Sequence, residues 1–142
     1  VNPTATVIID LQRLPRGAEL GPASIEPVAS DVGMLMTADW LSELTAQARS
    51  ACRNNAAVAN GKHPVRVVGR VIHFETPGVA SASADKSEII VRVRCESDGR
   101  VIGRANIVSR TDSTRPTLQQ DLIGAFAGGV ARWLSGVAAP GN

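Results

Sequence analysis

The alternation of apolar and polar residues in IIVRVRCESDGRVIGRANIVSR, residues 89–110, constrains the fold of this chain more than any other feature. The first run places Ile89, Val91, Val93 and Cys95 on one side, and a second run follows Asp98-Gly99. Two alternating runs around such a turn predict a β-hairpin with one buried face. The rest of the chain must therefore supply a layer that covers this face.

The register of the hairpin follows from the rule that directly paired residues share a face of the sheet. A two-residue turn at Asp98-Gly99 would place core residues opposite polar ones. A three-residue loop at 97–99 is therefore predicted, with Gly99 supplying a positive φ. This register pairs Glu96 with Arg100, and it also sets Cys95 opposite Val101, Ile89 opposite Ile107 and Arg92 opposite Arg104.

Two further strands are predicted from alternation, at 5–14 and 63–75. The first carries Ala5, Val7, Ile9 and Leu11 on one side, and the second separates its valines from Arg66 and Arg70. Proline and glycine between them, in 15–37, predict a long irregular loop with a short extended piece at 34–36. Residues 76–87 are interpreted as a connector of small residues, and 137–142 as a tail.

Two amphipathic helices are predicted from apolar residues at helical spacing. The first spans 38–54, with Thr37 as its N-cap. The second spans 118–135; TLQQ at 117–120 has the form of a capping box, and Gly136 ends the helix. In the second helix, Gly124, Gly128 and Gly129 indicate close packing, either against the sheet or against another subunit.

These elements give the order β-α-β-β-β-α, and 142 residues suffice for one domain with an apolar core. The fold class predicted for residues 1–142 is therefore α+β. An antiparallel sheet should carry both helices on one face, and the residues of the hairpin's apolar side, with Val101 among them, should lie in the core.

The opposite face of the predicted sheet is rich in arginine. One explanation is a solvated face of an antiparallel sheet, and the other is a docking surface for carboxylates or phosphates. The interface candidates are Arg66, Arg70, Arg92, Arg94 and Arg104. Nucleic acid is not an expected partner, because the net charge is only +2, tyrosine is absent and Phe74 alone could stack on bases there.

No motif of a nucleophile, a phosphate-binding loop or a zinc protease occurs, so we expect no enzyme activity. His63 and His73 lack the neighbouring ligands that zinc would need, and neither a metal nor another cofactor is expected. Asp31, Asp39 and Glu43 are interpreted as a loop turn and a helix start. Cys52 and Cys95 should face the same core layer, where they are either two buried thiols or one disulfide.

No apolar run reaches the roughly 18 residues that would span a bilayer. The hairpin segment SDGRVIGRANI (97–107), the segment DLIGAFAGGVARWL (121–134) and the order of elements resemble small bacterial ABC-type transport auxiliary lipoproteins and related envelope accessory proteins. The resemblance implies a non-catalytic structural or accessory subunit of a cell-envelope assembly for export, transport or surface appendages.

The same resemblance implies protein partners, among them further copies of the chain, and a periplasmic location. Anchoring to the outer membrane, which the resemblance also implies, would use a lipid that is not visible in this chain. A cytoplasmic location is the alternative. The alternative function is a soluble module that binds an anionic ligand or polymer through the arginine-rich face.

Overall fold

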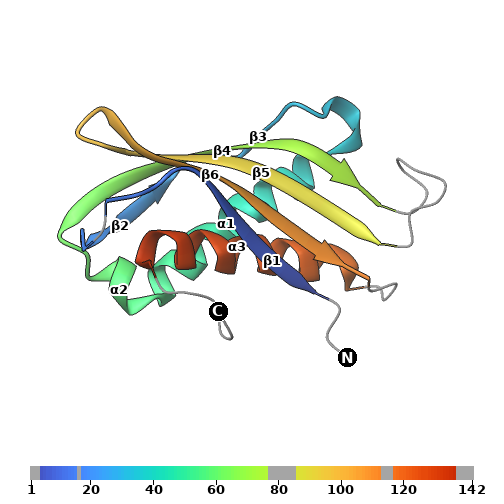
Figure 1. Ribbon diagram of the computed structural model, residues 1–142. Coiled ribbons are helices and arrows are strands. Elements are labelled where there is room, and N and C mark those ends of the chain that lie inside the picture. Colours follow the sequence, from blue (N-terminus) through green and yellow to red (C-terminus); the bar gives the residue numbers. More distant parts are fainter. Residues whose placement is uncertain (1–3, 16, 77–85, 113–116, 137–142) are drawn as a thin grey trace.

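The computed structural model describes residues 4–15, 17–76, 86–112 and 117–136 (Figure 1). Its elements, in chain order, are β1 (Ala5–Gln12), β2 (Leu20–Ile25), β3 (Ala29–Ser30), the 3₁₀ helix η1 (Gly33–Leu35), α1 (Ala38–Asn54), α2 (Ala56–Ala59), β4 (His63–Glu75), β5 (Ser87–Ser97), β6 (Arg100–Thr111) and α3 (Leu118–Ser135). The connector predicted for 76–87 lies mostly outside the described residues, and the tail at 137–142 lies wholly outside them.

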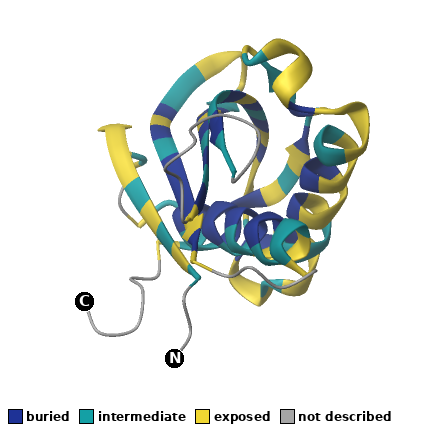
Figure 2. Cartoon of the chain, turned by 90° about the vertical axis from the view of Figure 1, so that its right-hand side faces the viewer, coloured by how far each residue is buried: buried dark blue, intermediate teal, exposed yellow. Residues whose placement is uncertain are grey.

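All the strands belong to one sheet in the order β1-β6-β5-β4-β2, with β3 also paired to β4. Most pairs are antiparallel, but β2 and β3 run parallel to β4. The sheet curls over α1 and α3, which pack together beneath one of its faces (Figures 1 and 2). The predicted α+β class, with both long helices on one face, is confirmed.

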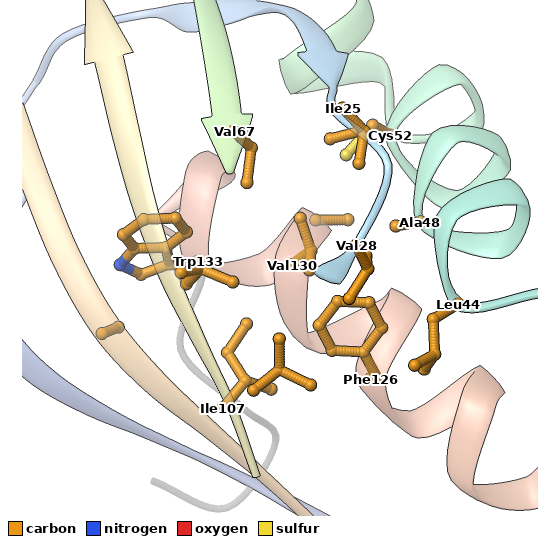
Figure 3. Close-up of a cluster of buried hydrophobic side chains, with 14 of the residues drawn as sticks. Ile25, Val28, Leu44, Ala48, Cys52, Val67, Ile107, Phe126, Val130 and Trp133 are labelled. Carbon is orange, nitrogen blue, oxygen red and sulfur yellow. The ribbon is translucent and has the colours of Figure 1, made fainter. Parts of the chain in front are cut away.

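The core lies between the sheet and these two helices. The hairpin contributes Ile89, Val91, Val93 and Ile107, all fully or almost fully buried. Figure 3 shows Phe126 and Val130 of α3 in the middle of the cluster, with Leu44 and Ala48 of α1 on one side. The apolar side of the predicted hairpin is therefore covered by the predicted helices.

Both long helices begin and end where the sequence places them, but only one of the two predicted N-caps forms. The Thr37 hydroxyl accepts a hydrogen bond from the Trp40 backbone N–H at 3.3 Å. Thr117 makes no such cap, because its ψ of 6° lacks the extended conformation that directs a capping side chain at the first turn. Its hydroxyl donates instead to the Asp121 carboxylate at 3.3 Å.

The long irregular loop predicted for 15–37 is wrong in part, because this segment contains β2, β3 and η1, and both strands pair with β4. Pro22 is compatible with β2 because this strand lies at the edge of the sheet, where a missing N–H costs no ladder bond. The Arg49 guanidinium donates to the Ile25 carbonyl at 2.8 and 3.1 Å, and thereby ties β2 to α1. The predicted extended piece at 34–36 is also wrong, since η1 occupies Gly33–Leu35.

The predicted hairpin register is wrong as well. Asp98 and Gly99 form a two-residue turn with φ of 52° and 77°, and Ser97 pairs with Arg100. A β-bulge then inserts Ile102 between the residues that pair with Glu96 and Cys95, so the later residues return to their expected faces. Consequently Arg94, not Arg92, lies opposite Arg104, and Val101 pairs with Glu96 on the polar side rather than joining the core.

Candidate interaction site on the outer face of the sheet

We call the side of the sheet that faces away from the helices the outer face. The five predicted interface residues all lie on it: Arg66 and Arg70 on β4, Arg92 and Arg94 on β5, and Arg104 on β6. They project from three adjacent strands, and all five are exposed to solvent. The structure therefore brings together every residue of the predicted set.

Much of the positive charge on this face is neutralised within the chain. Arg66 donates to Glu26 and to Glu96, each at 2.9 Å, and Arg94 donates to Glu96 at 2.6 Å. These contacts lower the pKa of Glu96, first through the hydrogen bond from Arg94 and then through that from Arg66. They also raise the pKa of Arg66, through Glu26 and Glu96 in that order.

Two of the neutralising carboxylates were missed by the sequence reasoning. Glu26 pairs with Arg66, and Asp31 accepts a hydrogen bond from Arg70 at 2.7 Å. Both belong to the 15–37 segment, and they reach the arginines because β2 and β3 lie alongside β4. The apolar residues Leu20, Ile25 and Val28, which are buried, are the signal that could have placed this segment against the sheet.

Arg92 and Arg104 are different, since neither has a carboxylate within ion-pair distance among the described residues. Arg92 donates to the Asn106 side chain at 3.1 Å, and Arg104 donates to the Gln12 side chain at 2.6 Å. Together with Arg70 and Arg94 they surround a shallow cavity of about 140 Å³. Two like-charged pairs face each other across strands here, Arg70 with Arg92 and Arg94 with Arg104. Such pairs are unfavourable unless an anion lies between them.

An apolar stripe borders this arginine-rich area, along β1. Its members Val7, Ile9 and Leu11 are 55%, 49% and 52% exposed. Val7 pairs with Val108 and Ile9 with Asn106, so both project from the outer face. β1 is also an edge strand of the sheet, with no further strand beside it in the described part of the chain. The alternation in 5–14 located this strand correctly, and its apolar side faces away from the helices.

A second exposed apolar feature, the apolar knob, consists of Met34 and Leu35 in η1. Met34 is 98% exposed and Leu35 43%. Within the described residues, the knob and the stripe account for all the large apolar side chains that are exposed. The knob follows β3, which pairs with β4, so it lies across the sheet from β1.

The cysteines and histidines form no comparable site. Cys52 and Cys95 are buried and unbridged. Burial raises the pKa of Cys52 to about 11 and, with a smaller contribution from Glu96, that of Cys95 to about 12. His73 Nε2 lies 3.4 Å from Glu88 and 3.5 Å from Glu75. The described residues contain no group of three ligands that could hold a metal ion.

A recess of about 930 Å³ lies at the C-terminal end of α3 beneath the segment that joins β1 to β2. Its charged lining residues are Asp10, Arg13, Glu19 and Arg132. Trp133 also lines it, and the buried indole N–H of this residue has no hydrogen-bond partner among the described residues. The lining combines no histidine, cysteine or paired carboxylates at hydrogen-bonding distance.

Comparison with known proteins gives a structural likeness but no sequence family. No protein-family model matches the chain, and no curated protein matches it. A PelC dodecamer from Paraburkholderia phytofirmans, in a variant with one substitution, is similar in structure, with a TM-score of 0.59 and 15% identity over 92% of this chain and 95% of that one. A second PelC dodecamer from the same organism gives 0.56 and 13%, over 92% and 96%.

The hypothetical protein CT253 from Chlamydia trachomatis is also similar, with a TM-score of 0.51 and 11% identity over 81% of this chain and 98% of that one. The chain is thus an α+β protein of the layered type described above. More particularly, it has a fold similar to that of PelC over nearly the whole length of both chains. No described helix is both long enough and apolar enough to cross a membrane.

Proposed function

We propose that this chain is a non-catalytic structural subunit of a bacterial cell-envelope assembly, in which several copies associate. The observation that carries the proposal is the apolar stripe on β1, three half-exposed side chains along an edge strand of the sheet. An edge strand with apolar side chains tends to pair with another chain unless something covers it. In a soluble domain, such a surface is typical of a protein–protein contact.

The comparison supports the same proposal. PelC, whose fold is similar, forms a dodecamer. The sequence resemblance to envelope accessory lipoproteins supports a periplasmic location and a role in export, transport or surface-appendage machinery. The mixed lining of the large recess, without an acid–base or nucleophilic pair among the described residues, favours a structural role over catalysis.

The proposal is tested in the native organism with a chromosomal copy that carries a C-terminal tag. Cells are fractionated, envelopes are cross-linked, and the tagged chain is recovered and sized under native conditions. We expect the chain in the envelope fraction, in a complex several times heavier than its own 14.8 kDa. A monomer recovered from the cytoplasmic fraction would contradict the proposal.

A second candidate function, a module that binds an anionic polymer, is favoured by the cavity between Arg70, Arg92, Arg94 and Arg104. Guanidinium groups bind carboxylates in paired hydrogen bonds, and two of these four lack a carboxylate partner in the described part of the chain. Polygalacturonate and uncharged dextran form a matched pair of probes in isothermal titration. Binding of the first alone, lost in Arg92→Gln, supports this candidate, and equal heats for both polymers contradict it.

A further inference from the structure

We infer that copies of this chain join head to tail, with the apolar knob of one copy seated on the apolar stripe of the next. The inference rests on the proposed function, because it names the contact through which the copies would associate. The knob is Met34 and Leu35 of η1, and the stripe is Val7, Ile9 and Leu11 of β1. The occupant of each surface is therefore a second copy of the same chain.

The first argument is the position of the two surfaces. Figure 2 shows β1, which rises from the N-terminal mark, on one side of the molecule. The chain around η1 lies on the opposite side, beyond β3 and β4. Two different surfaces on opposite sides can join only in a heterologous contact, which repeats from copy to copy. Such contacts close into a ring when the rotation between copies allows it.

The second argument is that both surfaces are apolar and that they differ in shape. On the outer face, Val7 of the stripe pairs with Val108, which is itself buried and pairs in turn with Ile90. The stripe is an extended apolar strip along a strand. The knob is a single turn whose Met34 side chain is almost wholly exposed. An unbranched methionine adapts its rotamers to an irregular apolar surface, which suits it to this role.

The third argument is charge. Beside the stripe lies Arg104 of β6, which donates to Gln12 at the end of β1. Beside the knob lie Asp39 and Glu43, one turn apart in the first two turns of α1. Within the described residues, none of these three side chains has an oppositely charged partner within ion-pair distance.

This distribution of charge selects one pairing of surfaces. A contact between two stripes would bring arginines together, and a contact between two knobs would bring carboxylates together. Only a stripe facing a knob sets Arg104 against the carboxylates of Asp39 and Glu43. Charge complementarity of this kind fixes which surfaces meet and suppresses the alternatives.

The test uses two variants of the full chain. Ile9→Glu places a charge in the stripe and leaves the knob intact, while the double variant Met34→Glu/Leu35→Glu does the reverse. All three residues are exposed, so both variants should fold, which circular dichroism and thermal melting verify. Gln47→Glu, an exposed position on α1 outside both surfaces, is the control for added negative charge.

Sedimentation velocity then separates the possible contacts. We expect the wild type and Gln47→Glu to form the same multi-subunit species and each of the two variants to be monomeric. In an equimolar mixture, the intact knob of one variant meets the intact stripe of the other. The mixture should therefore give a dimer of one copy of each and no larger species, because both outer surfaces of this dimer carry glutamate. Ile9→Val and Met34→Leu should assemble like the wild type.

Other outcomes overturn the inference in distinguishable ways. If either variant alone assembles like the wild type, or if the mixture stays monomeric, the knob and the stripe are not partners, although the proposed function stands. If the wild type is itself monomeric at every concentration and in cross-linked envelopes, both the inference and the proposed function are wrong. If Ile9→Glu fails to fold, Val7→Lys tests the stripe in its place. An equimolar mixture of Val7→Lys with the knob variant then shows whether an intact knob binds an intact stripe.

Discussion

Gly129 in α3 lies so close to Ile107 in β6 that a Cβ at the glycine would come within 3.0 Å of the isoleucine Cγ2. The same Cβ would come within 2.9 Å of Cγ2 of Thr6 in β1. Both neighbours are β-branched and cannot rotate away freely. This glycine therefore sets the distance between the helix and the sheet at the centre of the core.

Gly129→Ala should destabilise the protein even though alanine favours a helix by about 1 kcal/mol over glycine. Overpacking of a tight core costs about 1–3 kcal/mol, so we expect a net loss of about 1 kcal/mol in the free energy of unfolding. Gly124→Ala and Gly128→Ala are matched controls in the same helix, because no atom would lie within 4 Å of their added Cβ. Urea unfolding should show both controls to be stabilised.

This comparison also decides between the two interpretations of the helix glycines. Close packing on the sheet explains Gly129 and leaves Gly124 and Gly128 without a structural reason. If either control variant reduces assembly while raising the stability of the monomer, that glycine belongs to a contact between subunits. Unchanged assembly in both would leave only the packing role of Gly129.

A second prediction concerns Thr45, whose buried hydroxyl joins α1 to the segment between β2 and β3. The hydroxyl accepts from the Val28 backbone N–H at 2.9 Å and donates to the Leu41 carbonyl at 2.8 Å. Thr45→Val keeps the shape but leaves the Val28 N–H without a partner, which should cost about 1–3 kcal/mol. Thr45→Ser retains both hydrogen bonds and should cost about 1 kcal/mol.

Hydrogen exchange gives a local readout for this pair of variants. After correction for the global stability of each variant, the Val28 amide should exchange much faster in Thr45→Val than in Thr45→Ser. Equal protection of Val28 in both variants would show that the hydroxyl does not hold this segment in place.

The sequence predicted the helices and the central strands because each of them has a strong periodic pattern. α1 and α3 span the predicted residues because the apolar face of each helix packs against the apolar face of the sheet. β2 escaped prediction because its position depends on pairing with β4 and on contacts with Arg49, which local pattern does not encode. Phe74 was expected on the polar face, but the bulge after Val71 turns it into the core against Trp40.

The candidate site was predicted in part. Alternation placed the five arginines on one face, because residues two apart in a strand share a side. The carboxylates Glu26 and Asp31 could not be assigned to them without β2 and β3. Neither could alternation alone show which side of β1 faces solvent, since that depends on the bulges and on where α3 ends beneath the sheet.

A third prediction concerns the thiols. Because burial raises the pKa of Cys52 from 9.0 to about 11, its thiolate fraction at pH 8 falls by about 100-fold. Iodoacetamide should therefore modify both cysteines far more slowly in the folded protein than in urea. A cysteine that reacts at its unfolded rate in the native protein would contradict its burial. Alkylation in urea without a reductant also tests for the disulfide, since a Cys52–Cys95 bridge would block modification of both.

A fourth prediction concerns acid. Glu96 has a lowered pKa in the folded protein, so the unfolded chain binds a proton there more readily. The stability that its contacts contribute is present above the unfolded pKa, near 4.5, and is lost as the pH falls through the lower folded pKa. In Glu96→Gln, the free energy of unfolding should therefore decrease less steeply with falling pH below 4.5 than in the wild type. The double variant Arg66→Gln/Arg94→Gln should show a similarly reduced slope. Unfolding curves at a series of acidic pH values check this, and an unchanged slope in both variants would contradict the assignment.

The last prediction separates the arginine-rich area from the head-to-tail contact. Arg92 and Arg104 have no carboxylate partner in the described structure, so Arg92→Glu and Arg104→Glu, singly or together, should leave the melting temperature of the monomer nearly unchanged. Arg104 borders the apolar stripe through Gln12, whereas Arg92 lies further across the sheet beside Asn106.

If copies meet through the stripe and the knob, Arg104→Glu should weaken assembly more than Arg92→Glu, and added salt should reduce the difference. Glu43→Arg, on the opposite side of the contact, should weaken assembly to a similar degree. Combining it with Arg104→Glu should restore part of the loss, because the two reversed charges again attract. Sedimentation at low and moderate salt measures all four proteins against the wild type. If Arg92→Glu and Arg104→Glu weaken assembly equally and Glu43→Arg does not restore it, the head-to-tail contact is wrong. The copies would then meet through the arginine-rich area instead of the stripe.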